Sequence, residues 1–239
     1  MGVITVRMLG KAIPWMKVVV HVLCALPFLV LVWAYRDGSL GAQADPVNYI
    51  THFTGDWALW ILLVDLGITP VRRLSVKLGW LVRFRRMVGL WAFFYASLHL
   101  LTYVILFSGY DMPTALAGLR AGHLAEPWRQ LMVIWPAMKD DLLKRRFIQV
   151  GFAAWMLLLV LAVTSPARVM RAMGGKVWAR VHWGIYVAGG LAVVHYWWLV
   201  KTGVLRPWKD TAVLGVLLLA RVGWWGMKRW RRGYPAVAA

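Results

Sequence analysis

The segment WARVHWGIYVAGGLAVVHYWW, residues 178–198, decides the fold. It is predominantly apolar and carries two histidines, His182 and His195, which lie 13 residues apart. About 20 apolar residues are enough to cross the hydrocarbon core of a bilayer as a helix. Titratable side chains inside such a helix are costly and are functional candidates by default. The segment therefore predicts a membrane-spanning helix, with His182 and His195 as candidate functional residues.

The rest of the chain has the same apolar character. Of its 239 residues, 61% are hydrophobic and only 15% are charged, whereas a soluble domain has about 45–50% apolar and 25% charged residues. This composition excludes disorder and disfavours an ordinary soluble enzyme. We predict an all-α polytopic membrane helix bundle that forms a single membrane domain over residues 1–239. The six expected spans are residues 18–35, 53–69, 87–107, 148–164, 181–200 and 211–226.

The charge distribution predicts the orientation. The net charge is +19, which in a soluble protein indicates nucleic acid but in a membrane protein is typical of cytoplasmic loops. Basic residues without acidic ones fill the two termini and the segments after the second and fourth spans. We therefore expect a multi-pass membrane protein with both termini in the cytoplasm, lipid as a partner and no nucleic acid. The segment after the second span contains Arg83, Arg85 and Arg86. We expect these arginines mainly to keep the segment on the cytoplasmic side, and they could also bind haem propionates or lipid phosphates.

Other local signals set further expectations. In TPVRR (69–73) and TSPAR (164–168), proline is expected to end the second and fourth spans. These similar exits aside, no convincing internal repeat is visible. The apolar run near the N-terminus is longer than that of a typical secretory signal, so we expect it to remain as the first span. The single cysteine, Cys24, excludes an intrachain disulfide.

Two histidines are expected at similar depth in the membrane. At 1.5 Å per helical residue, His99 lies about 18 Å and His195 about 21 Å from the cytoplasmic ends of their spans. Two neutral imidazoles at equal depth on different helices can ligate one haem iron. His182 lies about 20 Å from His195 along the same helix and cannot share that iron. His182 instead indicates a second haem site. For every intramembrane histidine the alternative is a structural role as a hydrogen-bonded polar residue.

The remaining polar residues are weaker candidates. His21 lies near the depth of His182, whereas His52 and His123 are read as interfacial or loop residues. Asp56 and Asp65 are the acidic residues placed within a span. Asp65 is expected to pair with Arg72 or Arg73, with a proton-handling or quinone role as the alternative.

Several motifs together resemble one known family. They are HFTGDWALWILLVDLGITPVRR (52–73), RRMVGLWAFFYASLHLLTY (85–103), LAVTSP (161–166) and the segment quoted first. With WMKVVVHVLCALPFLVLVWA (15–34) they cover nearly the whole chain and resemble the MsrQ family, also called YedZ, of the ferric-reductase-like transmembrane group. The resemblance implies a haem-binding membrane subunit that takes electrons from the quinone pool, with flavin (FMN) as an associated cofactor. It also implies delivery to MsrP, a periplasmic molybdopterin reductase that repairs methionine sulfoxide in oxidised proteins.

Carried over residue by residue, the resemblance places axial ligands of haem b iron at His99, His182 and His195. His21 is a weaker candidate, and one or two haems are expected. Relatives in the wider group have a second histidine 13 residues before the position of His99, where this chain has Arg86. They also have a soluble flavin and nicotinamide domain, for which this chain has no room. The outer segment 108–147 is longer than the family leads us to expect.

Three functions are therefore compared. The leading one is an electron-transfer subunit of an oxidoreductase complex, with no catalytic residues of its own. The second is a stand-alone quinone-linked cytochrome b or metalloreductase. The third is a non-redox scaffold or transporter in which the histidines are structural.

Overall fold

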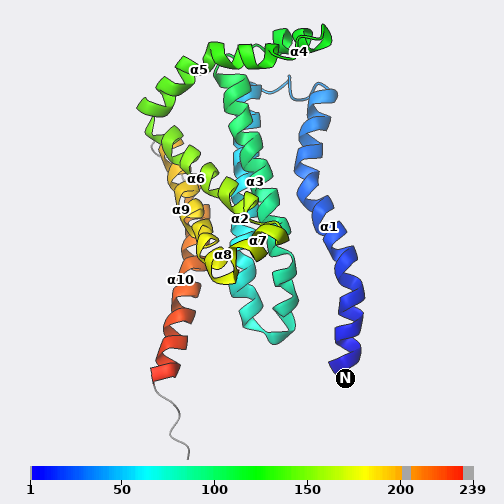
Figure 1. Ribbon diagram of the computed structural model, residues 1–239, viewed down its shortest axis with the longest axis vertical. Coiled ribbons are helices and arrows are strands. Elements are labelled where there is room, and N and C mark those ends of the chain that lie inside the picture. The colour runs from blue at the N-terminus through cyan, green and yellow to red at the C-terminus, as the bar shows by residue number, and fades with distance from the viewer. Residues whose placement is uncertain (1, 201–205, 234–239) are drawn as a thin grey trace, which may run out of the picture. The chain divides into compact units, whose positions relative to one another are not determined.

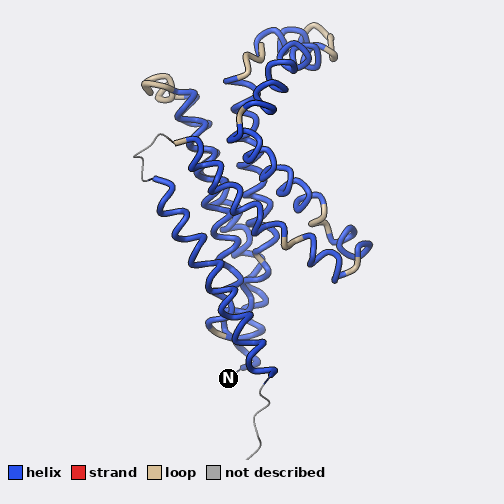
Figure 2. Tube along the Cα trace, turned by 90° about the vertical axis from the view of Figure 1, so that its left-hand side faces the viewer, coloured by secondary structure: helices blue, strands red, loops and turns tan. Residues whose placement is uncertain are grey.

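The computed structural model describes residues 2–200 and 206–233, with side chains described over 12–200 and 207–230. These residues form helices and no strand (Figure 2), which confirms the predicted all-α class. Ten α-helices, one 3₁₀ helix (η1) and one π-helix (η2) follow one another along the described chain (Figure 1). They are α1 (Gly2–Arg36), α2 (Pro46–Leu74), η1 (Val76–Arg83), α3 (Arg85–Thr102), η2 (Tyr103–Phe107), α4 (Met112–Arg120), α5 (Glu126–Lys144), α6 (Arg146–Val163), α7 (Ala167–Met173), α8 (Gly175–Val181), α9 (Gly184–Leu199) and α10 (Arg206–Gly233).

Six helical stretches are long and apolar enough to cross a membrane, as predicted. They are Ala12–Arg36, Pro46–Leu74, Arg85–Phe107, Arg146–Val163, Gly175–Leu199 and Pro207–Trp230. The expectation that Pro70 ends the second span is wrong, because α2 continues through it to Leu74. A proline removes only its own backbone N–H from the helical ladder, and membrane helices tolerate that loss. Pro166, by contrast, lies between α6 and α7, where the expected exit is found.

The described chain divides into two compact units. The first runs to Ile61 and includes Arg86–Arg145, and the second consists of Leu62–Arg85 and the chain from Arg146 onward. In the first unit the fully buried Tyr95 of α3 contacts α1. Its hydroxyl accepts a hydrogen bond from the Phe28 amide (3.0 Å) and donates one to the Cys24 carbonyl (2.7 Å). Those two backbone groups are an i, i−4 pair that normally bond each other, so the side chain is inserted into the ladder of α1.

Replacing Tyr95 with Phe should therefore destabilise the protein by about 1–3 kcal/mol, since two buried backbone groups lose a shared partner. Reversible denaturation in detergent, followed by circular dichroism, measures the change. Tyr35→Phe is the matched control because the Tyr35 side chain is exposed. Equal stability of the two variants would show that the α1 ladder closes without the hydroxyl.

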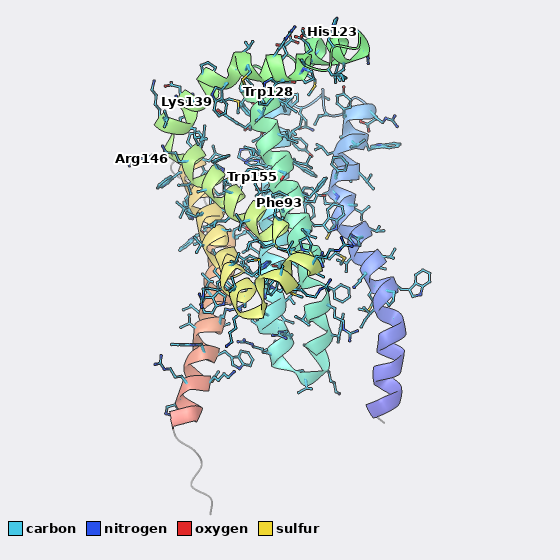
Figure 3. All side chains as sticks on the ribbon, in the orientation of Figure 1. Phe93, His123, Trp128, Lys139, Arg146 and Trp155 are labelled. Carbon is cyan, nitrogen blue, oxygen red and sulfur yellow. The ribbon has the colours of Figure 1, made fainter. Side chains whose placement is uncertain are left out.

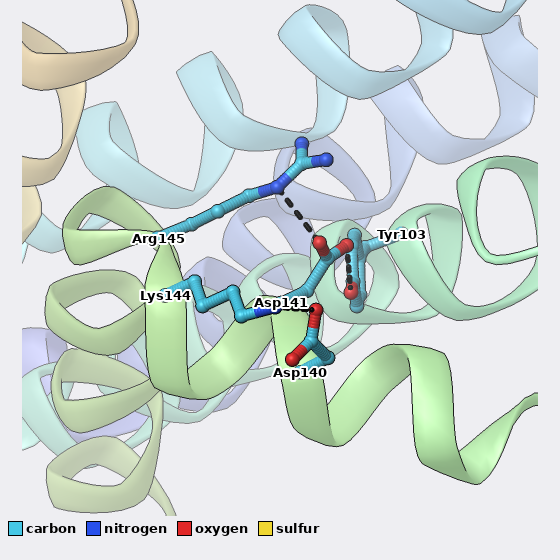
Figure 4. Close-up of polar contacts among 5 residues, drawn as sticks. All are labelled: Tyr103, Asp140, Asp141, Lys144 and Arg145. Carbon is cyan, nitrogen blue, oxygen red and sulfur yellow. Dashed lines mark hydrogen bonds and ion pairs between the residues drawn. The ribbon is translucent and has the colours of Figure 1, made fainter.

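The outer segment 108–147 is folded, although the sequence analysis treated it as a loop. It forms α4 and α5, which pack on each other, and His123 lies in the turn between them (Figure 3). Asp111 caps α4 by accepting hydrogen bonds from the backbone and side chain of Thr114, and these bonds hold the pKa of Asp111 below its usual range. At the other end, Tyr103 of η2 donates to Asp141 of α5 at 2.9 Å, and Asp141 also pairs with Arg145 (Figure 4). The segment is therefore attached to the end of the third span.

In the second unit, α6 and α9 form the closest pair of described helices. Small residues allow close approach elsewhere in this unit, as is common in membrane bundles. A Cβ added at Gly189 of α9 would lie 3.2 Å from the side chain of Leu66, and one added at Gly67 would lie 3.8 Å from Leu217 of α10. The second half of α2 therefore packs against both α9 and α10.

Candidate functional site

His99 is held against α2 by a backbone carbonyl and a glycine. Its Nδ1 lies 3.0 Å from the carbonyl oxygen of Thr51. One helical turn further along α2, a Cβ added at Gly55 would lie only 3.1 Å from the imidazole ring. The ring therefore lies close against Gly55, and a side chain at that position would require the ring or the helix to shift slightly.

His195 is held in the same way against α6. Its Nδ1 lies 2.7 Å from the carbonyl oxygen of Phe147. One turn further along α6, a Cβ added at Gly151 would lie 2.7 Å from that same nitrogen, closer than real Cβ atoms come. In both cases the histidine ring lies against a glycine, and its Nδ1 is bonded to the carbonyl of the residue four positions before that glycine. We call this arrangement a histidine seat.

The two seats have identical spacing along the chain. Each histidine lies 48 residues after its carbonyl partner, and each residue of the second seat lies 96 positions after its counterpart in the first. The sequence alone shows no convincing repeat because only a few scattered positions are shared. The structure therefore reveals a correspondence between the α2–α3 and α6–α9 pairs.

The seats fix the tautomer of both histidines. A carbonyl oxygen only accepts, so Nδ1 must carry the hydrogen that it donates. In a neutral imidazole the lone pair is then on Nε2, which is the state of a metal-ligating histidine whose other nitrogen bonds a carbonyl. Both His99 and His195 are thus held in the tautomer in which Nδ1 carries the hydrogen and Nε2 the lone pair.

In His182 the hydrogen-bonded ring nitrogen is Nε2, whereas in His99 and His195 it is Nδ1. It lies in the break between α8 and α9, where the sequence analysis expected one continuous span, and its ring stacks on Trp178 at 4.0 Å. Its Nε2 lies 3.1 Å from the hydroxyl of Thr164, which already donates to the Val160 carbonyl at 2.7 Å. Nε2 is therefore the donor, and iron ligation through it would require the ring to leave Thr164.

His21 is the less suitable of the candidate ligands. Its Nδ1 accepts a hydrogen bond from the indole nitrogen of Trp91 at 2.9 Å. In the neutral ring the other nitrogen then carries the hydrogen, and no lone pair remains for a metal. Of the other histidines, His52 is half-buried on α2 and His123 is exposed.

The two acidic residues within spans are both buried. Asp65 was expected to pair with Arg72 or Arg73, but its nearest cation is Arg85, whose Nε lies 3.9 Å from Oδ2. Asp56 lies one residue after Gly55 in α2. No group of three or more histidine, cysteine or acidic side chains in the described part of the chain could hold a metal ion, and ligation of a haem iron by two histidines requires no such group.

Sequence reasoning identified the histidines but missed the residues that hold them. Gly151 lies in an apolar stretch and Gly55 follows a short polar one, and nothing in a single sequence shows which of its glycines faces a histidine on another helix. The matching 44-residue spacing from glycine to histidine, Gly55 to His99 and Gly151 to His195, is the one signal that could have found them.

The fold and the seats define a class of membrane protein, and comparison with known families agrees. Residues 54–193 match the family described as "Ferric reductase like transmembrane component". This range contains Gly55, His99, Gly151 and His182 and ends two residues before His195.

Similar curated proteins narrow the class to one family. One from Xanthomonas oryzae pv. oryzae (strain MAFF 311018) is 41% identical over 217 residues, covering 89% of this chain and 86% of the relative. One from Xanthomonas campestris pv. campestris (strain 8004) is 39% identical over 220 residues, covering 90% and 86%, and one from Herminiimonas arsenicoxydans is 38% identical over 215 residues, covering 89% and 87%. All three are named "Protein-methionine-sulfoxide reductase heme-binding subunit MsrQ". The chain belongs to the MsrQ family of ferric-reductase-like membrane proteins.

Proposed function

We propose that this chain binds haem b and is the electron-transfer membrane subunit of a protein-methionine-sulfoxide reductase. The observation that carries the proposal is the pair of histidine seats, which present two imidazoles in the tautomer that ligates iron. The names of the relatives, heme-binding subunits of such a reductase, support the same conclusion.

The residues of this chain hold and orient the cofactor, while a bound haem supplies reversible one-electron transfer. Thr51 and Phe147 fix the ring orientation of His99 and His195 through their carbonyls. We infer that one haem uses His99 and His195. A second haem at His182 is a weaker proposal, because the residue at the corresponding position of the first pair is Arg86.

The electron source and the recipient follow from the family resemblance. The chain takes electrons from the quinone pool and delivers them to a periplasmic molybdopterin reductase of the MsrP type, which carries out the sulfoxide reduction. FMN is proposed as an associated cofactor on the same ground. The protein lies in the bacterial inner membrane as a single domain with both termini in the cytoplasm. A reporter fused after Ala239 that is active only in the periplasm would contradict this orientation.

Spectroscopy and reconstitution test the function. The purified protein should show a haem b spectrum with a defined haem content per chain. A reduced quinone analogue should reduce that haem, and added MsrP-type reductase with an oxidised-methionine substrate should reoxidise it. A haem-free protein would refute the proposal. A haem that is reduced but is not reoxidised by the reductase would indicate a stand-alone cytochrome.

The α4–α5 segment is the proposed docking surface for the reductase. Trp128 and Trp135 of α5 are both more than half exposed, and Trp residues are frequent anchors of interfaces. Replacing both with Ala should slow reoxidation by the reductase about tenfold while leaving the haem spectrum unchanged. Stopped-flow spectroscopy measures the rate, and Trp183→Ala on the other unit, also well exposed, is the control. An unchanged rate would remove α5 from the docking surface.

A further inference from the structure

Four arginines gather in the second unit, and we call Arg72, Arg73, Arg85 and Arg221 the arginine cluster. Arg221 of α10 lies over the ring of Tyr186 of α9, and Arg73 lies over the ring of Trp224, three residues after Arg221. Arg72, Arg73 and Arg85 are close enough for their charges to act on the Arg221 guanidinium. The arginines therefore come from the end of α2, the start of α3 and the second half of α10.

The cluster has a large excess of positive charge. The acidic residues in this unit are Asp65 and Asp210. Asp210 lies 11 residues before Arg221 on α10, about 16 Å along the helix, and is too distant to neutralise it. Asp65 can balance one guanidinium at most. Like charges in a partly buried, low-dielectric setting repel strongly, so an anion is needed to stabilise the remaining three.

Aromatic rings hold two of the guanidinium groups without neutralising them. The Arg221 guanidinium carbon lies 4.4 Å from the centre of the Tyr186 ring, and that of Arg73 lies 5.7 Å from the Trp224 ring. Arg221 and Trp224 are three residues apart and therefore share a face of α10. A ring face attracts a cation but accepts few of its five N–H groups, so the guanidinium groups keep donors available for an anion.

Hydrogen-bonding groups at the cluster lack partners among the described residues. Two potential donors, the Nε of Arg72 and the hydroxyl of Tyr186, are buried and unbonded. Oδ1 of Asp65 is also buried and unbonded, but it is an acceptor, so a phosphate would not satisfy it. The 3.9 Å separation between Asp65 and Arg85 is too long for a hydrogen bond. Buried polar groups are bonded in the great majority of structures, so such a group marks a missing partner.

We propose that the arginine cluster is a binding site for a phosphate group. A phosphate supplies the missing negative charge, and its several acceptor oxygens match the donors of Arg72, Arg221 and Tyr186. Two sources present this group at the edge of a membrane, namely the phosphodiester of an anionic lipid and a soluble phosphate monoester. The site does not depend on haem binding, and its soluble source rests on the FMN cofactor of the proposed function, whereas its lipid source does not.

The experiment makes two comparisons, one between flavins with and without a phosphate group and one between lipids that share a phosphodiester but differ in net charge. The purified full-length protein is titrated with FMN and with riboflavin, which lacks the phosphate, and binding is followed by flavin fluorescence. In parallel, retention of phosphatidylglycerol is compared with that of phosphatidylcholine by native mass spectrometry. Tighter binding of FMN than of riboflavin indicates the soluble source, and selective retention of phosphatidylglycerol indicates the lipid.

Matched variants assign the binding to the cluster. Arg72→Gln with Arg221→Gln should weaken the selective ligand about tenfold or more, since each charge-assisted hydrogen bond to phosphate is strong. Arg168→Gln with Arg171→Gln removes the same charge from exposed positions of α7 and should change binding less than twofold. Tyr186→Phe tests the site with a milder change and should weaken binding several-fold.

Three results would overturn the proposal. The first is the absence of any phosphate-dependent binding in either arm. The second is an equal effect of the α7 control, which would reduce the cluster to general surface charge. The third is loss of haem in the cluster variants with phosphate binding unchanged, which would assign the arginines to the carboxylates of the cofactor.

Discussion

His99→Ala and His195→Ala are each expected to abolish the same low-spin haem absorbance, while His182→Ala leaves that absorbance in place. Each of the first two variants removes a proposed ligand, an imidazole whose Nδ1 bond to a carbonyl places the lone pair on Nε2. A six-coordinate haem that loses one strong ligand becomes five-coordinate or dissociates. His182, by contrast, donates from Nε2 to Thr164 and so does not present that nitrogen to a metal.

Absorption and electron paramagnetic resonance spectra of the purified variants, with haem measured per chain, check this result. The low-spin signal should fall at least tenfold in either single variant, and the double variant should look no worse. His123→Ala, at an exposed position between α4 and α5, is the control. If His182→Ala removes the signal and His99→Ala leaves it intact, the assignment of the ligands must be redrawn.

Gly151→Ala should have nearly as large an effect, although it removes no ligand. A Cβ at this position would lie 2.7 Å from Nδ1 of His195, so the ring must move off the seat or α6 must shift. Either movement breaks the bond to the Phe147 carbonyl. Loss of such a supporting contact typically weakens metal binding about 10- to 100-fold. Gly55→Ala should be milder, because its Cβ would lie 3.1 Å from the His99 ring.

The effect of Gly151→Ala is measured in two ways, as haem affinity and as the proportion of high-spin haem. A general loss of packing does not selectively raise the high-spin proportion. Gly190→Ala on α9 is the matched control, since a Cβ there meets nothing within 4 Å. The control should bind haem like the unchanged protein. If Gly151→Ala keeps both affinity and spin state, the seat has no role in holding His195.

The sequence was sufficient to predict the all-α class and the six helices of membrane length, because apolar runs of that length have few alternative structures. The ends of the helices were less predictable. Pro70 does not end α2, and the fifth span is broken at His182, since local propensity is overridden by packing and hydrogen bonding. The folded α4–α5 segment was also missed because it is too polar to resemble a span.

The candidate site was predictable only in part. The histidines stand out because they are polar residues in apolar stretches. Their tautomers depend on which atoms lie opposite each ring, and the acceptors are backbone carbonyls that every residue possesses. Likewise, the pairing of Asp65 with Arg85 instead of Arg72 or Arg73 depends on how the start of α3 approaches α2. Such choices are made by tertiary structure and leave little trace in one sequence.

The equal spacing of the two seats has an evolutionary consequence. A 48-residue separation that recurs 96 positions later is what duplication of an ancestral two-span segment would leave behind. Such an ancestor would have assembled as a dimer of identical copies, each contributing one seat, and fusion would have freed the halves to diverge. Arg86 and His182 occupy equivalent places in the two halves and show this divergence. The α6–α9 half has a titratable imidazole, His182, where the α2–α3 half has a permanently charged guanidinium, Arg86. A symmetric ancestor would thus have become a chain whose two halves differ at this position.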